Sequence, residues 1–207
     1  MPKEKPKHKE RLVPKSMQDM KAWQLTRKQF IGSIITAGIA AQLPFNRAFG
    51  NSQQAENFLS EEQKSILQSV QEILFPADEN GPGASEINAY DYIVWVMADP
   101  LKDPAEVKYF INGIGWIEES ANEIFSKKYI ELKDEEKLEL IRTVSKENWG
   151  EGWLSVLLTF IFEALLSDPL YGGNPENIGW QWLDYKNGLP RPTPELLYPE
   201  IFKTIKF

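Results

Sequence analysis

The sequence contains no cysteine and a single histidine, His8. Without cysteine, the chain has no disulfide framework, no thiolate zinc site, no iron–sulfur cluster and no covalent c-type haem attachment. His8 lies in a lysine-rich N-terminal stretch, outside the region expected to fold. A Ser-His-Asp triad, a haem-binding helix pair and a Glu-x-x-His di-iron bundle all need a histidine inside the folded part. The sequence therefore predicts no catalytic residue, no bound cofactor and no metal site in this chain.

Charge is distributed unevenly along the chain. Residues 1–29 carry nine Lys/Arg and three Asp/Glu, whereas residues 51–207 carry thirteen Lys/Arg and twenty-seven Asp/Glu, and the net charge of the whole chain is −7. A folded part this acidic repels phosphate backbones. Nucleic acid is therefore not an expected partner.

The first fifty residues resemble an export signal. The stretch with Arg27, Lys28 and Phe30 is similar to the twin-arginine pattern Ser/Thr-Arg-Arg-x-Phe-Leu, with lysine in place of the second arginine. An apolar run of about a dozen residues follows, which is shorter than the roughly 20 residues of a membrane span, and Ala48-Phe49-Gly50 suits a signal-peptidase site.

We therefore predict that residues 1–50 direct the chain to the periplasm through the twin-arginine export machinery. Two alternatives stay open for this segment. An uncleaved signal would tether the protein to the membrane through residues 31–45, and an amphipathic helix at the edge of the domain is the other interpretation.

The sequence predicts one helical domain over residues 51–185. Helical spacing of apolar residues, capping residues and prolines predict helices that start at Ser60, Ser85, Asp103 and Asp134, and a fifth over about residues 151–166. In the fourth helix, Leu138, Ile141 and Val144 are expected to face inward. The fifth is apolar nearly all round, which is typical of a central core helix. The predicted fold class is all-α, a single compact bundle of about five to six helices, with residues 186–207 as an extended Pro-rich tail.

Three places are candidates for chemistry. The loop from Asp78 to Gly81 is interpreted as a turn in preference to a calcium site, because it lacks EF-hand spacing. Glu163, alone among apolar residues, is interpreted as a structural hydrogen-bonding group, for instance to the Tyr171-Gly172-Gly173 loop, in preference to a general base. The paired glycines are interpreted as a tight helix exit in which Asp168 and Asn174 bond turn amides, in preference to a phosphate loop.

The last of these places holds the most specific motif of the chain. It comprises Glu163, Asp168-Pro169, Tyr171-Gly172-Gly173-Asn174, Gly179-Trp180 and Gly188-Leu189-Pro190. Supporting matches flank the first predicted helix: Leu59-Ser60 before it, and Ile73-Leu74-Phe75-Pro76-Ala77-Asp78 with Gly81-Pro82-Gly83-Ala84 at its end. With these motifs, roughly residues 58–192 resemble the gluconate 2-dehydrogenase subunit 3 family, the small subunits of flavin-dependent sugar and sugar-acid dehydrogenases.

The resemblance implies a function that the composition alone does not. In that family an FAD-bearing large subunit of the glucose–methanol–choline type oxidises the sugar, and a multihaem c-type cytochrome passes electrons to the membrane. The small subunit carries the export signal and helps its large partner to fold, remain stable or be exported. The resemblance transfers no catalytic residue, so the motif residues, together with Trp180 and Trp182, are expected at structural or interface positions.

Two other functions were weighed against this accessory role. A free-standing periplasmic sugar-binding protein would stack its tryptophans on sugar rings and use Glu163 and Asn174 to bond hydroxyls. An enzyme in its own right would need a histidine, a cysteine or paired acids in the mature region. The sequence favours the non-catalytic accessory subunit.

Overall fold

The computed structural model of the chain describes residues 11, 13–14, 58–188, 191 and 193. The described part is helical and contains no strand, only an isolated bridge between Asp78 and Gly81. Its elements are α3 (Glu61–Leu74), α4 (Ala89–Met97), α5 (Pro104–Phe125), η3 (Tyr129–Glu131), α6 (Asp134–Val144), α7 (Asn148–Leu166), η4 (Pro169–Tyr171), η5 (Pro175–Asn177) and α8 (Ile178–Trp182). The all-α prediction is confirmed.

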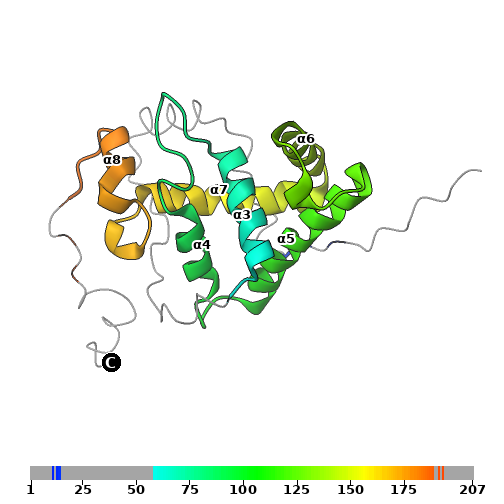
Figure 1. Ribbon diagram of the computed structural model, residues 1–207. Helices are drawn as coiled ribbons and strands as arrows, with labels where there is room; N and C mark the ends of the chain where they lie inside the picture. The colour runs from blue at the N-terminus through cyan, green and yellow to red at the C-terminus, as the bar shows by residue number, and fades with distance from the viewer. Residues whose placement is uncertain (1–10, 12, 15–57, 189–190, 192, 194–207) are drawn as a thin grey trace, which may run out of the picture.

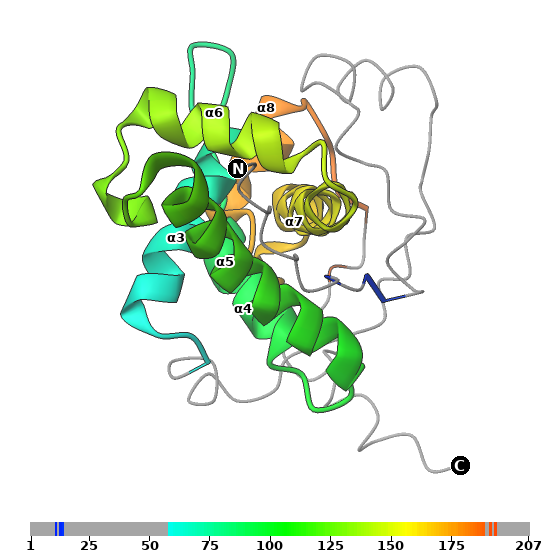
Figure 2. The same cartoon turned by 90° about the vertical axis from the view of Figure 1, so that its right-hand side faces the viewer.

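Helix α7 is the central element of the bundle. Its residues are apolar nearly all round, so every face gains by burial, and helices α3, α4, α5 and α8 pack against it. Figure 1 shows α7 running behind α3 and α4, and Figure 2 views it almost end-on with α5 running diagonally beside it. Of the described residues, only this helix is long and apolar enough to cross a membrane, but 78% of the apolar window lies inside the bundle. The prediction of a core helix is confirmed.

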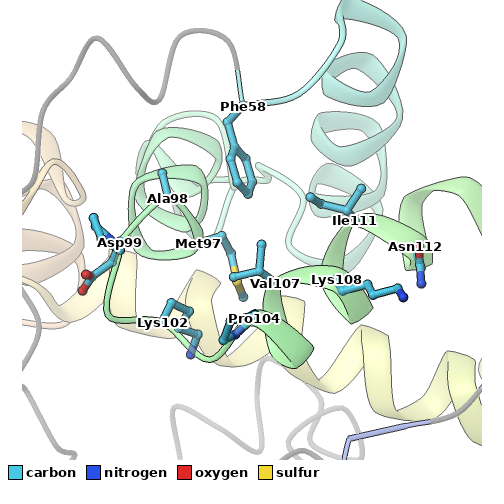
Figure 3. Close-up of a pocket in the computed structure, with 11 residues that line it drawn as sticks. Phe58, Met97, Ala98, Asp99, Lys102, Pro104, Val107, Lys108, Ile111 and Asn112 are labelled. Atoms are coloured by element: carbon cyan, nitrogen blue, oxygen red, sulfur yellow. The ribbon is translucent and has the colours of Figure 1, made fainter.

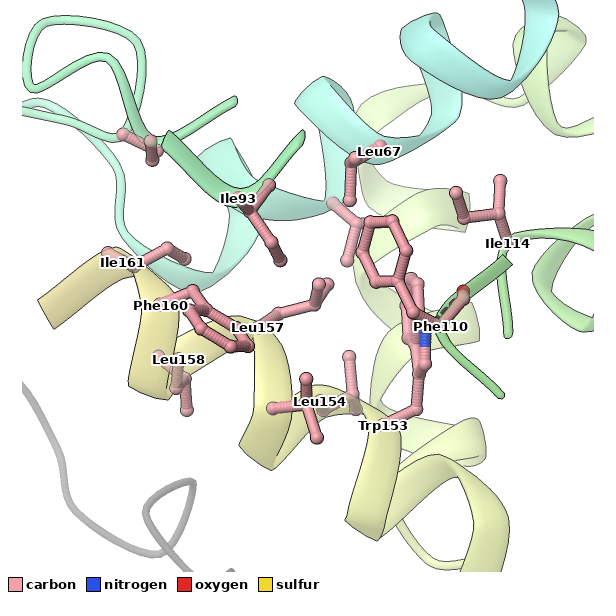
Figure 4. Packing of buried hydrophobic residues seen from close by; sticks show 14 of the residues in the cluster. Leu67, Ile93, Phe110, Ile114, Trp153, Leu154, Leu157, Leu158, Phe160 and Ile161 are labelled. Atoms are coloured by element: carbon pink, nitrogen blue, oxygen red, sulfur yellow. Dashed lines mark hydrogen bonds between the residues drawn. The ribbon is translucent and has the colours of Figure 1, made fainter. Parts of the chain in front are cut away.

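Helices α5 and α7 meet at a glycine in the core. A Cβ at Gly113 would lie 2.1 Å from the indole of Trp153, so the absence of a side chain there lets the two helices meet. The Trp153 indole is fully buried, and its Nε1 donates to the carbonyl of Phe110 at 3.0 Å. Figure 4 shows Trp153 and Phe110 beside the aliphatic residues of α7.

Two of the predicted helix starts are confirmed in detail. The Ser60 side chain accepts from the amide of Gln63, whose side chain accepts from the Ser60 amide, which makes a capping box at the start of α3. At α5 the Asp103 side chain accepts from the Ala105 amide, and Pro104 occupies the first helical position.

The second predicted helix starts later than Ser85, at Ala89. The Ser85 amide donates to the carboxylate of Glu72 at 2.7 Å, so this residue belongs to a turn tied to α3. Asn88 then has a φ of 56°, in the left-handed region, which an α-helix cannot continue through.

Three further differences concern faces and ends. Leu138 is 39% exposed, so its predicted inward position is wrong, whereas Ile141 and Val144 are buried as predicted. Helix α7 begins at Asn148, three residues before the expected start. The short helix α8 was not predicted.

Two predicted segments lie largely outside the described residues. Arg27, Lys28 and Phe30 of the export signal are among the residues that are not described. Most of the 186–207 tail is not described either, and its described residues, 186–188, 191 and 193, form no helix.

Candidate functional site

The most specific sequence motif folds into the helix-exit motif, defined here as residues 163–182, at one end of α7 (Figure 1). Asp168 begins the exit, because its carboxylate accepts from the Leu170 amide at 3.1 Å and caps η4. Gly172 ends η4 with a φ of 86°, a left-handed conformation that glycine adopts without strain. The predicted tight helix exit is confirmed at Asp168.

Asn174 is the central polar residue of this motif and is completely buried. Its side-chain Nδ2 donates to the carbonyl of Ser167 at 3.0 Å, and its Oδ1 accepts from the amide of Gly179 at 2.7 Å. Its own amide donates to the carbonyl of Ile87 at 3.1 Å. One residue thus joins the end of α7, the start of α8 and the turn before α4, and the prediction that Asn174 bonds turn amides is confirmed.

Two glycines in the motif leave no room for a side chain. A Cβ at Gly173 would lie 2.6 Å from the carbonyl oxygen of Ala164, and one at Gly179 would lie 2.3 Å from that of Leu165. Both clashes are with the backbone of α7, which cannot move aside as a flexible side chain can. The glycines therefore serve close packing of the exit on α7, not the approach of a phosphate.

The two tryptophans of the motif are turned inward. Trp180 is 7% exposed and donates through Nε1 to the carbonyl of Leu166 at 2.9 Å. Trp182 is half-buried, donates through Nε1 to the carbonyl of Asn80 and packs edge-on to Phe75. Of the two expected roles, structural or interface, Trp180 has the structural one, because its indole stabilises the docking of α8 on α7.

Arg191 is a member of the site that sequence reasoning missed. Its Nη2 donates to Asp168 Oδ1 and Oδ2, both at 2.9 Å, and its guanidinium lies 5.5 Å from the centroid of Trp180. The paired contact fits the planar fork of arginine. Arg191 directly follows Gly188-Leu189-Pro190, the last part of the sequence motif.

Glu163 is half-buried on α7 and has the structural hydrogen bond expected of it. The donor is the Tyr92 hydroxyl of α4, which lies 3.4 Å from Glu163 Oε2. Burial raises the pKa of the Glu163 carboxyl, although the Tyr92 hydrogen bond and the charge of Lys102 oppose that rise. Burial likewise raises the pKa of Tyr92.

The Asp78–Gly81 loop has the geometry of a turn. Asp78 and Gly81 exchange backbone hydrogen bonds, and the Asn80 amide donates to Asp78 Oδ1 at 2.8 Å. Nowhere in the described part of the chain do three His, Cys, Asp or Glu side chains gather in a way that holds a metal ion. The loop instead supplies the carbonyl that receives Trp182.

A groove of about 600 Å³ lies at the α4–α5 connection and was not anticipated. Figure 3 shows Phe58, Met97 and Val107 pointing toward one another in it, with Lys102 at one end. Its other lining residues are Ala98, Asp99, Pro100, Pro104, Lys108, Ile111 and Asn112. A proline on each side of Leu101, which is 64% exposed, was the sequence signal for this non-helical corner. The polar side chains in its lining are Asp99, Lys102, Lys108 and Asn112.

The sugar site considered from the sequence does not assemble. Both polar atoms of the Asn174 side chain are used inside the protein, and Trp180 has almost no free face. Glu163 faces Tyr92 of α4. These residues build and brace the fold.

A comparison with protein families finds one match. The model described as gluconate 2-dehydrogenase subunit 3 matches residues 61–188, which run from the start of α3 to just beyond α8. No curated protein matches the chain, and no solved structure does.

Proposed function

The chain belongs to the gluconate 2-dehydrogenase subunit 3 family, whose members are subunits of a dehydrogenase complex, and we propose that it is the non-catalytic accessory subunit of a periplasmic, membrane-bound flavoprotein dehydrogenase. Its partner is an FAD-bearing large subunit of the glucose–methanol–choline type, which it helps to fold, to remain stable and to be exported. A c-type cytochrome is a possible third subunit. The family match over residues 61–188 carries this proposal.

The residue inventory supports a role without chemistry. The chain has no cysteine, and its one histidine precedes the bundle, so the ligands that hold haem or iron–sulfur clusters are missing from its sequence. Glu163, the candidate base, accepts a hydrogen bond from the Tyr92 hydroxyl, and because burial raises the pKa of Tyr92, this hydroxyl gives up its proton poorly at neutral pH.

The use of the motif residues supports the same role. Asn174, Trp180 and the paired glycines fix the geometry of the exit from α7, and their polar atoms are directed into the protein. These residues give one end of the bundle a fixed shape. A fixed surface of this kind suits a subunit that is bound by a partner protein.

The direct test is expression of the large subunit with and without this chain. Co-expression is expected to give soluble large subunit with a full complement of flavin, measured as the flavin-to-protein absorbance ratio of the purified fraction. The large subunit alone is expected to be insoluble or poor in flavin. Soluble, fully loaded and active large subunit obtained without this chain would contradict the proposal.

A further inference from the structure

A short piece of the basic N-terminal stretch lies against the bundle. The Arg11 side chain is only 8% exposed, and its guanidinium carbon lies 4.6 Å from the ring centroid of Trp149 and 5.7 Å from that of Trp116. These distances are those of cation–π contacts. A residue in a lysine-rich, basic stretch is thus buried against two tryptophans from different helices.

Two carboxylates flank the same guanidinium. Arg11 Nη2 donates to Glu119 Oε2 at 3.1 Å, and Nη1 lies 3.8 Å from Glu147 Oε2. The Glu147 carboxylate is itself fixed, because Trp149 Nε1 donates to it at 2.5 Å. A planar cation stacked between rings and edged by carboxylates matches arginine, whose weakly hydrated guanidinium stacks and bonds at once, better than lysine.

Contacts among side chains of the bundle itself fix the positions of the residues around Arg11. Trp116 and Trp149 meet edge to face at 5.3 Å, and Tyr109 packs on Trp116 at 5.9 Å. The Tyr109 hydroxyl donates to the carbonyl of Trp149 at 2.7 Å. The side chains therefore come from α5 and from the start of α7, and only the folded bundle brings them together.

The contact extends beyond Arg11 to Val13. A Cβ at Gly152 would lie 3.3 Å from Val13 Cγ1 and 2.8 Å from the Tyr109 hydroxyl, so the bare backbone of α7 at this point makes room for the segment. Val13 belongs to the layer of half-buried residues packed on the core. Arginine and valine, two positions apart, both contact the bundle, as in an extended peptide lying in a groove.

We propose that Trp116, Glu119, Glu147 and Trp149 form an arginine-peptide site, occupied in cis by Arg11, which ties the basic N-terminal stretch to the folded bundle. Because the site needs both α5 and α7, the segment is held only after the domain has folded, and the presentation of the signal depends on folding.

The absence of cysteine allows a direct test on the full chain. A single cysteine is introduced as Lys15→Cys and labelled with a dye, and the time-resolved fluorescence anisotropy is recorded. The dye is expected to rotate with the whole domain. Adding Arg11→Gln is expected to remove this slow component, and Arg11→Lys is expected to restore it only in part, because lysine keeps the charge but not the stacking fork.

Two further variants separate a lost site from a lost fold. Glu119→Gln changes a carboxylate that is 63% exposed, so it is expected to weaken the slow component without changing the circular dichroism spectrum. Lys9→Gln removes the same charge as Arg11→Gln and is expected to leave the slow component unchanged. A fast-rotating dye in the unmutated background, or equal anisotropy in Arg11→Gln and the parent, would overturn the proposal.

The effect on signal presentation rests on the proposed export function of residues 1–50, whereas the arginine-peptide site itself does not. Capture of the large subunit is measured separately, so loss of the arginine-peptide site and loss of the accessory role give different results.

Discussion

At the scale of single residues, Asn174 shows how one buried amide fixes the end of a bundle. It has a left-handed φ of 51°, a conformation that asparagine tolerates better than most residues, and its side chain joins Ser167 to Gly179. Replacing the Asn174 side chain with a methyl group would leave the carbonyl of Ser167 and the amide of Gly179 buried and unpaired. Each such group costs about 1–3 kcal/mol.

We predict that Asn174→Ala lowers the free energy of unfolding by about 3 kcal/mol. Urea unfolding followed by circular dichroism measures this loss. Asn187→Ala is the matched control, because Asn187 is exposed beyond α8 and its change is expected to stay within about 0.5 kcal/mol. Equal midpoints for the two variants would show that the network around Asn174 contributes nothing.

Glu163 makes stability depend on pH in the direction opposite to most native carboxylates. Its pKa is raised in the folded state, so between the unfolded pKa, about 4.3, and the folded pKa the native protein binds more protons than the unfolded chain. Stability contributed by this residue therefore falls as the pH rises through that window.

We predict that Glu163→Gln unfolds at higher urea concentration than the parent at pH 7, and that the difference disappears near pH 4. Glutamine can still accept from the Tyr92 hydroxyl but carries no charge to bury. Glu139→Gln on the exposed face of α6 serves as control and should change little. A Glu163→Gln protein that is less stable at pH 7 than at pH 4, relative to the parent, would refute this assignment.

At the scale of elements, the crossing of α5 and α7 depends on one of two neighbouring glycines. Gly113 faces the fully buried Trp153, whereas a Cβ at Gly115 meets nothing within 4 Å. Both are in the interior of α5, where alanine is favoured over glycine by about 0.8–1.0 kcal/mol.

We predict opposite effects for the two substitutions. Gly115→Ala should raise the free energy of unfolding by about 0.5–1 kcal/mol, whereas Gly113→Ala should lower it by about 1–2 kcal/mol because the helices must separate. Denaturant midpoints of the two variants measured side by side decide this. Stabilisation by both would mean that the tryptophan moves aside without cost.

Most helices could be predicted from the sequence because their ends carry local signals. Ser60 with Gln63 and Asp103 with Pro104 act within one turn, so no tertiary information is needed to recognise them. Ser85 looked equivalent but is held by Glu72, thirteen residues earlier, and such a competing tertiary contact is invisible to capping rules. On α6 only Leu138 was misjudged, because packing against α5 decides which residues of the helix face inward.

The candidate site was predictable only in part. The turn at Asp168 and the amide contacts of Asn174 follow from residue type and short spacing. Tyr92 and Glu163 are 71 positions apart in the sequence, and Asp168 and Arg191 are 23 positions apart. Nothing in a single sequence specifies such pairs, and the inward orientation of Trp180 depends on the same tertiary packing.

At the scale of the whole molecule, the proposed function assigns export to the basic N-terminal segment and the accessory role to the acidic domain. We predict that Arg27→Gln leaves both this chain and the large subunit in the cytoplasm, because a single signal would serve the complex. Dehydrogenase activity and flavin in the periplasmic fraction report this, and Lys21→Gln, with the same loss of charge, should leave export unchanged. Normal export of the large subunit beside a retained Arg27→Gln chain would contradict the shared signal.

The central claim is that this chain is the accessory subunit of a flavoprotein dehydrogenase. Its most direct test is a pull-down of the tagged full chain from the native membrane fraction, with the absorbance spectrum of the eluate recorded. We predict a stoichiometric partner with flavin bands, and haem bands as well if a cytochrome subunit is present. A colourless eluate that contains this chain alone would contradict the account.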